Sequence, residues 1–249
     1  MVKAKRLIAV GVVALLAGVV VTFPARVAYQ WFAPAGLTLS GISGSIWSGA
    51  AAQGSAGGLF LSDVSWRFRP LSLTGLKLGY TVAANIPSGF LESDVAVGIG
   101  GSMHFSDLAA AMSLASLGAV LPDVLPGNGI EGSLRIELEG LVLADGFPTH
   151  AEGTVDIDGL LLRALSPTAL GDYRAALQSS GEGISAAIED VSGILDVSGS
   201  LVLAQDRTFS LVGQVAPTAS APPGVLEQLQ FLGSPDPQGR REFRIEGGL

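Results

Sequence analysis

Apolar and polar residues alternate with a period of two through most of the chain after residue 36. Residues 130–138 place Leu134, Ile136 and Leu138 between polar or charged neighbours, and residues 154–158, 194–203 and 208–215 repeat the pattern. Because successive side chains of a β-strand point to opposite faces, this alternation predicts strands with one buried and one solvated face.

Glycines separate these stretches, which recur about every 8–15 residues with short connections. Parallel strands need crossovers of a dozen or more residues, whereas antiparallel neighbours can be joined by tight turns. The spacing therefore predicts an all-β fold, an extended antiparallel sheet with few short helices.

Three segments are candidates for those helices. Residues 105–117 are rich in Ala, Leu and Met but lack a continuous apolar face, and residues 169–178 follow the capping candidates Ser166 and Thr168. Residues 225–232 follow a pair of prolines. None approaches the length of the strand-rich region.

The domain organisation follows from composition. Residues 37–58 are rich in Gly, Ser and Ala like a linker, but Leu39, Ile42 and Trp47 favour strands joined by close turns. We therefore divide the chain into residues 1–35 and one β-rich domain, residues 36–249. A cluster of Pro and Gly at residues 119–129 marks a candidate lobe boundary, and residues 217–224 are the clearest break.

The N-terminal sequence predicts a membrane anchor. Lys3, Lys5 and Arg6 precede an uncharged apolar run at residues 7–23, which is near the lower limit for a spanning helix. Tyr29, Trp31 and Phe32 follow as an interfacial aromatic belt does. The basic flank predicts a cytoplasmic N-terminus, with everything after about residue 30 on the far side of the membrane.

A cleaved signal peptide is the alternative. Its apolar region is usually about 7–15 residues long and ends in an A-x-A-like site. Ala28 could serve at the last position of such a site, but Arg26 is a poor partner two residues before it. We therefore expect the anchor to be retained.

Charge and cysteine content narrow the functional classes. The net charge of −8 disfavours nucleic-acid binding, because an acidic surface repels a phosphate backbone. The absence of cysteine excludes disulfides, thiolate catalysis and thiolate metal sites.

No motif with adequate specificity for catalysis is present. The chain lacks a P-loop and a G-x-S-x-G nucleophile elbow. Its two histidines, His104 and His150, exclude a three-histidine zinc site. His150 could share a strand face with Glu152 and bind a metal with it. The simpler interpretation is that His150 is a solvated turn residue. We predict no catalytic, cofactor or metal site and no enzymatic activity.

Two carboxylate pairs and three aromatic residues are the remaining candidates for a site. On a strand, residues two apart point to the same face, as in the pairs Glu137 with Glu139 and Asp156 with Asp158. A position on the solvated face explains these pairs better than acid–base catalysis or calcium binding. The aromatic residues favour core anchors over a partner-binding surface; they are Trp47, Trp66 and Tyr80.

The C-terminal segment, residues 232–240, predicts a rigid turn that delivers a final strand. Pro235 and Pro237 fix their φ angles, Asp236 can accept hydrogen bonds from nearby amides, and Gly239 tolerates a positive φ. Arg240 and Arg241 then stand as adjacent cations, suited to ion pairing with a neighbouring strand or to an acidic partner.

Three short motifs resemble a known family. They are Gly44-Ser45-Ile46-Trp47-Ser48-Gly49, then Val64-Ser65-Trp66-Arg67-Phe68-Arg69-Pro70-Leu71, and Leu232-Gly233-Ser234-Pro235-Asp236 followed by Gly239-Arg240. Their order and spacing, after a single anchor, resemble protein N of the bacterial type II secretion system along essentially the whole chain. Residues 105–125 match no pattern of that family.

This resemblance implies a non-enzymatic inner-membrane subunit of the apparatus that exports folded proteins from the periplasm through an outer-membrane secretin. The other subunits and the inner membrane are the partners it implies. The chain is also distantly similar to AsmA-like proteins, in which an anchor carries a long curved sheet with an apolar groove. That likeness implies the alternative function of lipid binding or envelope bridging.

Overall fold

The structure of the 249-residue chain is a computed structural model. It describes residues 11–12, 15, 18–33, 36–98, 100–119, 129–181 and 183–248. The helical elements are α2 (Ala25–Phe32), η1 (Pro70–Gly75), η2 (Leu114–Ala119), α3 (Pro223–Leu229) and η3 (Gln230–Leu232). The first seven strands are β1 (Leu37–Ser40), β2 (Ser43–Gly44), β3 (Ser48–Ala56), β4 (Leu59–Arg69), β5 (Lys77–Ile86), β6 (Gly89–Gly98) and β7 (Met103–Ser113). The remaining strands are β8 (Ile130–Ala144), β9 (Phe147–Leu162), β10 (Gly171–Ser180), β11 (Gly183–Gly193), β12 (Leu195–Ala204), β13 (Thr208–Pro217) and β14 (Arg241–Gly248).

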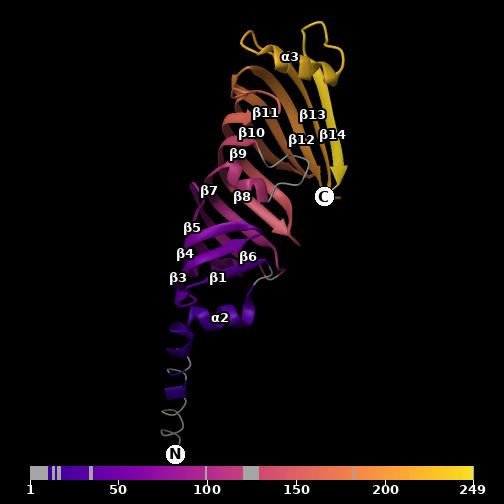
Figure 1. Cartoon of the computed structure of the whole chain (residues 1–249). Helices are drawn as coiled ribbons and strands as arrows, with labels where there is room; N and C mark the ends of the chain where they lie inside the picture. The colour runs from indigo at the N-terminus through magenta and orange to yellow at the C-terminus, as the bar shows by residue number, and fades with distance from the viewer. Residues whose placement is uncertain are drawn as a thin grey trace, which may run out of the picture.

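The fourteen strands of the described residues form one antiparallel sheet. From β3 to β14 each strand pairs with the next in sequence, β1 pairs with the far side of β3, and β2 is a short addition to β3. Figure 1 shows the sheet as a long twisted ribbon that rises from α2 near the N-terminus to α3 at the opposite end. The predicted all-β antiparallel fold with few short helices is confirmed.

The alternation in the sequence gives this sheet two different faces. Leu134 stands opposite Ile157 on the next strand, and this row lies on what we call the apolar face. One residue along, Arg135 stands opposite Asp156, which stands opposite Arg174, on the polar face. Because a shift of one residue would move every side chain to the wrong face, the pattern fixes the register.

Bulges bend the ribbon at several strands. Asp63 in β4 and Asp107 in β7 have φ angles of 49° and 50°, and each lies where the pairing register shifts by a residue. An extra residue in one strand increases the local twist and curves the sheet. The bulges also change the phase of the alternation, so that Leu61 and Val64 both belong to the apolar core.

The apolar face holds two groups of buried residues. The larger group spans β3 to β8 and includes Ala51, Ala110 and Met112, with Trp66 packed against it. The smaller group forms where α3 covers the distal end of the sheet, through Val225 and Leu229. The curvature of a single sheet thus encloses the first core, and a short helix closes the second.

The helix predicted at residues 169–178 is wrong, and so is most of the candidate at residues 105–117. The first is strand β10, in which Tyr173 and Leu177 face one way and Arg174 the other, paired on both sides by β9 and β11. The second is mostly strand β7, followed by η2. Small residues such as Ala permit either structure, and the two flanking ladders decide for strand. The helix predicted at residues 225–232 is confirmed as α3 and η3.

Among the described residues, no helix is long and apolar enough to cross a membrane. The predicted anchor at residues 7–23 lies in large part outside the described residues, as does most of the candidate lobe boundary at residues 119–129. The end of the apolar run is held against the sheet. Pro24 bridges to Ser45, and the Ile46 amide donates to the Phe23 carbonyl at 3.0 Å.

Candidate functional site

The two histidines lie closer together than their sequence separation suggests. His104 on β7 and His150 on β9 each stand opposite Val142 on β8, so they occupy one row of the sheet. His150 approaches Glu152 at 3.7 Å, whereas His104 lies 3.2 Å from the Ser102 hydroxyl. Burial, with the nearby charge of Lys77, lowers the pKa of His104. No group of three or more potential metal ligands occurs among the described side chains.

The carboxylates of β9 are paired with arginines. Arg174 Nε donates to Asp156 at 2.6 Å, and Arg135 lies 3.5 Å from Asp158. Asp156 is buried, which corrects its predicted solvated position, while Asp158, Glu137 and Glu139 are exposed. The hydrogen bond that Arg174 donates to Asp156, together with the charge of that carboxylate, raises the pKa of Arg174. These ion pairs cross from β9 to both of its neighbours, so this row of charges joins β8, β9 and β10.

The aromatic residues join the start of the sheet to the N-terminal segment. Trp47, Phe68 and Tyr80 stack edge to face, with ring centroids 4.7 and 5.5 Å apart. The Trp47 indole donates to the carbonyl of Val20 at 2.8 Å, and the Trp66 indole donates to that of Ser45 at 3.1 Å. Burial raises the pKa of Tyr80. Trp66 packs against the main core, as predicted, whereas Trp47 and Tyr80 make their ring contacts outside both core groups.

The C-terminal turn has the predicted geometry. One carboxylate oxygen of Asp236 accepts hydrogen bonds from the amides of Gln238 and Arg240, at 2.9 and 2.8 Å. Gly239 has a φ of +83°. The Arg240 guanidinium reaches Asp196 on β12 at 3.0 Å, which confirms the predicted ion pair. Arg241 donates to the carbonyl of Gly233 instead.

The two edges of the sheet differ in accessibility. At the β1 edge, the Tyr29 hydroxyl of α2 donates to the carbonyl of Leu37 at 3.1 Å and accepts from the amide of Leu39 at 3.0 Å. A single side chain thus satisfies two outward-facing backbone groups of a four-residue strand. The sequence gives no sign of this cap, because Tyr29 also fits an interfacial belt.

The opposite edge, β14, is open in the described structure. This eight-residue strand pairs with β13 alone, so its outer row of backbone groups has no strand partner. Its polar face carries Glu242, Arg244 and Glu246, and its apolar face carries Phe243 and Ile245. Edge charges discourage indiscriminate pairing, while an open backbone permits addition of a matching strand.

The apolar face beside β14 is only partly covered. Leu201, Leu203, Phe209 and Leu211 are half-buried there, and Ile245 is 53% exposed. The distal core holds Tyr173, whose pKa is raised to about 12, first by burial and then by the charges of Asp190 and Asp172. The open edge and this adjoining face form the candidate functional site, and they suit binding rather than catalysis.

Comparison with known proteins points to a single family. The family model described as type II secretion system (T2SS), protein N, matches residues 35–244. The chain is 28% identical to "Type II secretion system protein N" of Vibrio cholerae serotype O1 over 247 residues, which cover 94% of each chain. It is 26% identical to the protein of the same name from Aeromonas hydrophila over 215 residues, 85% of this chain and 84% of the relative. No solved structure matched the chain. Because the family model covers most of the chain, this protein belongs to the type II secretion system protein N family.

Proposed function

We propose that the protein is a non-enzymatic inner-membrane subunit of the type II secretion system, which assists the export of folded periplasmic proteins across the outer membrane. Family membership supports the role in type II secretion. The observation that carries the mechanism is the contrast between a β1 edge closed by Tyr29 and an open β14 edge. On this proposal β14 receives a strand from another subunit of the apparatus.

The arrangement of the two ends supports such a role. The sheet begins at the end of the apolar run, where Trp47 and Ile46 bond to the carbonyls of Val20 and Phe23. The open edge lies at the opposite end of the ribbon (Figure 1). With strands about 4.8 Å apart, the thirteen-strand path extends on the order of 60 Å. The basic N-terminal flank would remain in the cytoplasm, and β14 would stand well away from the periplasmic membrane surface.

The side chains of β14 determine which side chains a partner strand must carry. A partner that continues the sheet needs apolar side chains opposite Phe243 and Ile245. It needs cations opposite Glu242 and Glu246 and an anion opposite Arg244. Backbone bonds provide affinity in this mode of recognition, and the side chains provide specificity.

Site-specific photocrosslinking in secreting cells tests this proposal. A photoreactive residue at Ile245 should crosslink to another subunit of the apparatus, and the same residue at Thr38 on the closed edge should not. Glu242→Lys with Glu246→Lys should reduce secretion, whereas the single change Glu227→Lys on the exposed side of α3 should not. Equal crosslinking from both edges, or normal secretion by the β14 variant, would contradict the proposal.

A lipid-binding or envelope-bridging role, as in AsmA-like proteins, is the second candidate. It is favoured by the half-buried apolar face of β12 and β13, over which the described residues place no second layer apart from α3 at one end. Native mass spectrometry of the purified chain distinguishes the two candidates. A bound phospholipid that is lost in Leu211→Asp would favour lipid binding, and a bound secretion subunit would favour the scaffold.

A further inference from the structure

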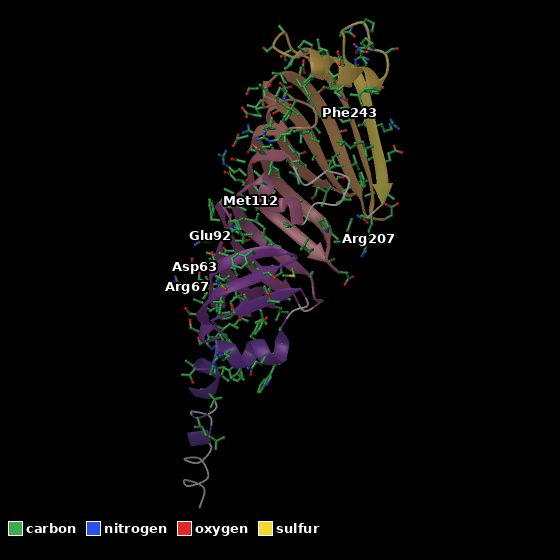
Figure 2. All side chains as sticks on the ribbon, viewed as in Figure 1. Asp63, Arg67, Glu92, Met112, Arg207 and Phe243 are labelled. Atoms are coloured by element: carbon green, nitrogen blue, oxygen red, sulfur yellow. The ribbon has the colours of Figure 1, made fainter. Side chains whose placement is uncertain are left out.

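Charge is distributed very unevenly along this acidic chain. Seven of its 14 Lys and Arg residues, but one of its 22 acidic residues, lie before residue 81. Four of these seven cations are in the described structure: Arg26 on α2, Arg67 and Arg69 on β4, and Lys77 at the start of β5. Figure 2 shows Arg67 on the first strands of the sheet, near the N-terminal segment, and Phe243 at the far end.

The basic residues of the two regions also differ in pairing. Beyond residue 80, five arginines form ion pairs with carboxylates, namely Arg135, Arg163, Arg174, Arg240 and Arg244. In the first region Arg69 pairs with Asp94. Arg26, Arg67 and Lys77 have no carboxylate partner among the described residues. Unpaired cations gathered at one end of an acidic protein indicate a contact with an anionic surface.

Exposed leucines accompany these cations. Leu71 and Leu73 in η1, and Leu76 directly after it, are 80%, 50% and 71% exposed. Three large aliphatic side chains on one short turn are unusual for a surface that faces only water. On α2, Trp31 and Phe32 are similarly exposed, at 66% and 76%.

The polar groups of η1 are used internally. The Ser72 hydroxyl donates to the carbonyl of Arg69 at 2.6 Å and accepts from the amide of Gly79 at 2.8 Å. The Thr74 hydroxyl donates to the carbonyl of Leu71 at 2.7 Å. The turn is therefore tied to itself and to β5 by its hydroxyls, and it presents its leucines outward.

Contacts place η1 near the end of the apolar run. The indole of Trp47 bonds to the carbonyl of Val20, within that run, and the carbonyl of Trp47 accepts from the amide of Phe68 at 2.7 Å. Phe68 stands two residues before Pro70, the first residue of η1. The turn and the first cations of the sheet are thus held beside the segment that we assign to the membrane.

We infer that η1 is a second membrane contact, which inserts Leu71, Leu73 and Leu76 into the interfacial region of an anionic lipid surface. Arg67, Lys77 and Arg26 would face the lipid phosphates, and the aromatic end of α2 would continue the contact. Apolar side chains with adjacent cations are the combination that binds anionic bilayers. This inference rests on the proposed membrane anchoring, because the contact lies on the periplasmic leaflet only if residues 7–23 span the bilayer.

The absence of cysteine allows a direct test with single spin labels on the full chain. Leu71→Cys, Phe231→Cys and Val19→Cys would be labelled separately and reconstituted in vesicles of phosphatidylethanolamine and phosphatidylglycerol. Phe231 is the matched control, because it is an 86% exposed apolar residue on η3 at the other end of the molecule. Collision rates with oxygen and with a water-soluble nickel complex report lipid and water exposure, respectively.

We expect the label at residue 71 to collide more often with oxygen, and the label at residue 231 to collide more often with the nickel complex. The label at residue 19 reports on the anchor, so the two hypotheses fail separately. Water exposure at residue 71 with lipid exposure at residue 19 would overturn only the second contact. Shielding of residue 71 from both reagents would also overturn it, because it would indicate a protein partner. Water exposure at residue 19 would overturn the anchor itself.

The lipid charge supplies a further criterion. In Leu71→Cys, adding Arg67→Glu and Lys77→Glu should reduce oxygen access at the label. Adding Arg207→Glu, a charge reversal on the β12–β13 turn, should leave it unchanged. Replacing phosphatidylglycerol by phosphatidylcholine should act like the first pair of changes. If oxygen access at residue 71 changed neither with the lipid charge nor with the charge reversals at Arg67 and Lys77, recognition of an anionic surface would be contradicted.

Discussion

At the scale of single residues, the tightest constraint near the N-terminal segment is the contact between Gly49 and Trp66. The Trp66 ring lies across Gly49, where a Cβ atom would overlap the ring and lie 2.6 Å from the carbonyl of Ser43. Neither neighbour can retreat easily, because the Trp66 indole also bonds to Ser45 and packs on the main core. The glycine that ends the Gly44–Gly49 motif is therefore required by the position of a tryptophan.

Gly49→Ala should destabilise the domain. Forcing a methyl group into a packed site typically costs about 1–3 kcal/mol, so the denaturant midpoint should fall at unchanged slope. Gly224→Ala is the control, because a Cβ there meets nothing within 4 Å and lies in α3. Equal midpoints for Gly49→Ala and the wild type would show that Trp66 can move aside.

Tyr173 should make the fold sensitive to alkali. Its pKa in the folded protein is about 12, whereas the ordinary value is 10.0. A group whose pKa is raised by folding binds its proton more tightly in the folded state, so its contribution to stability is complete below pH 10. That contribution declines as pH rises from about 10 to about 12.

Absorbance at 295 nm measures the ionisation directly. One tyrosine should titrate near pH 12, and Tyr173→Phe should remove that step and reduce the loss of stability above pH 10. Asp190→Asn should lower the pKa of Tyr173, because the charge of Asp190 contributes to raising it. If no tyrosine of the folded protein titrated above pH 10, the conclusion that Tyr173 is buried would be contradicted.

At the scale of elements, the sequence predicts strands better than it predicts where helices occur. The alternation at residues 130–138, 194–203 and 208–215 is present in β8, β12 and β13. The sequence does not indicate strand β10, because Ala175 and Ala176 suit a helix as well as a strand and the two partner strands are not visible in a local window. The bulges at Asp63 and Asp107 are not visible in the sequence either, because their positive φ angles depend on strand pairing.

The candidate site was predictable only in part. The final strand and its turn follow from Pro235, Asp236 and Gly239, and a meander in sequence order makes the last strand an edge. The closure of the other edge does not follow, because it depends on one hydroxyl group of Tyr29 meeting Leu37 and Leu39. Which edge stays open is therefore a tertiary property.

Removal of that hydroxyl tests the closure. Tyr29→Phe keeps the ring but leaves the carbonyl of Leu37 and the amide of Leu39 without their partner. Losing these bonds should cost on the order of 1 kcal/mol of local stability, which corresponds to roughly fivefold faster amide exchange at Leu39. Exchange in β13 should not change, and faster exchange there would mean that Tyr29 supports the whole sheet rather than one edge.

At the scale of the whole molecule, the N-terminal segment and the sheet form a continuous structure. The Pro24–Ser45 bridge, the Ile46 amide and the Trp47 indole join the segment to the β2–β3 hairpin. The Ile46 bond is part of the Pro24–Ser45 bridge, so the hairpin holds the segment at two places, the bridge and the Trp47 indole, and two separate contacts fix an angle as well as a position. A sheet held at a fixed angle presents its distal edge at a defined height above a membrane, and a flexible linker would not do so.

Trp47 is the residue on which this fixed angle depends most, because it joins the Val20 carbonyl, the Phe68 ring and β4. Trp47→Ala removes both the hydrogen bond and the ring contact, and truncating a packed aromatic costs about 3–5 kcal/mol when the side chain is fully buried. Trp47 is half-buried, so we expect a smaller loss and a folded protein. The larger effect should be a loosened junction between segment and sheet.

Pulsed electron paramagnetic resonance measures that junction. Spin labels at Val19→Cys and Phe90→Cys, two exposed positions on the segment and on β6, should give a narrow distance distribution in lipid nanodiscs. Trp47→Ala should broaden it, while Leu226→Ala on α3 should not. Secretion should decline in proportion to the broadening if the partner of β14 must be met at a defined height. A distribution that stays narrow in Trp47→Ala would mean that the Pro24–Ser45 bridge, with its Ile46 hydrogen bond, is sufficient to hold the angle.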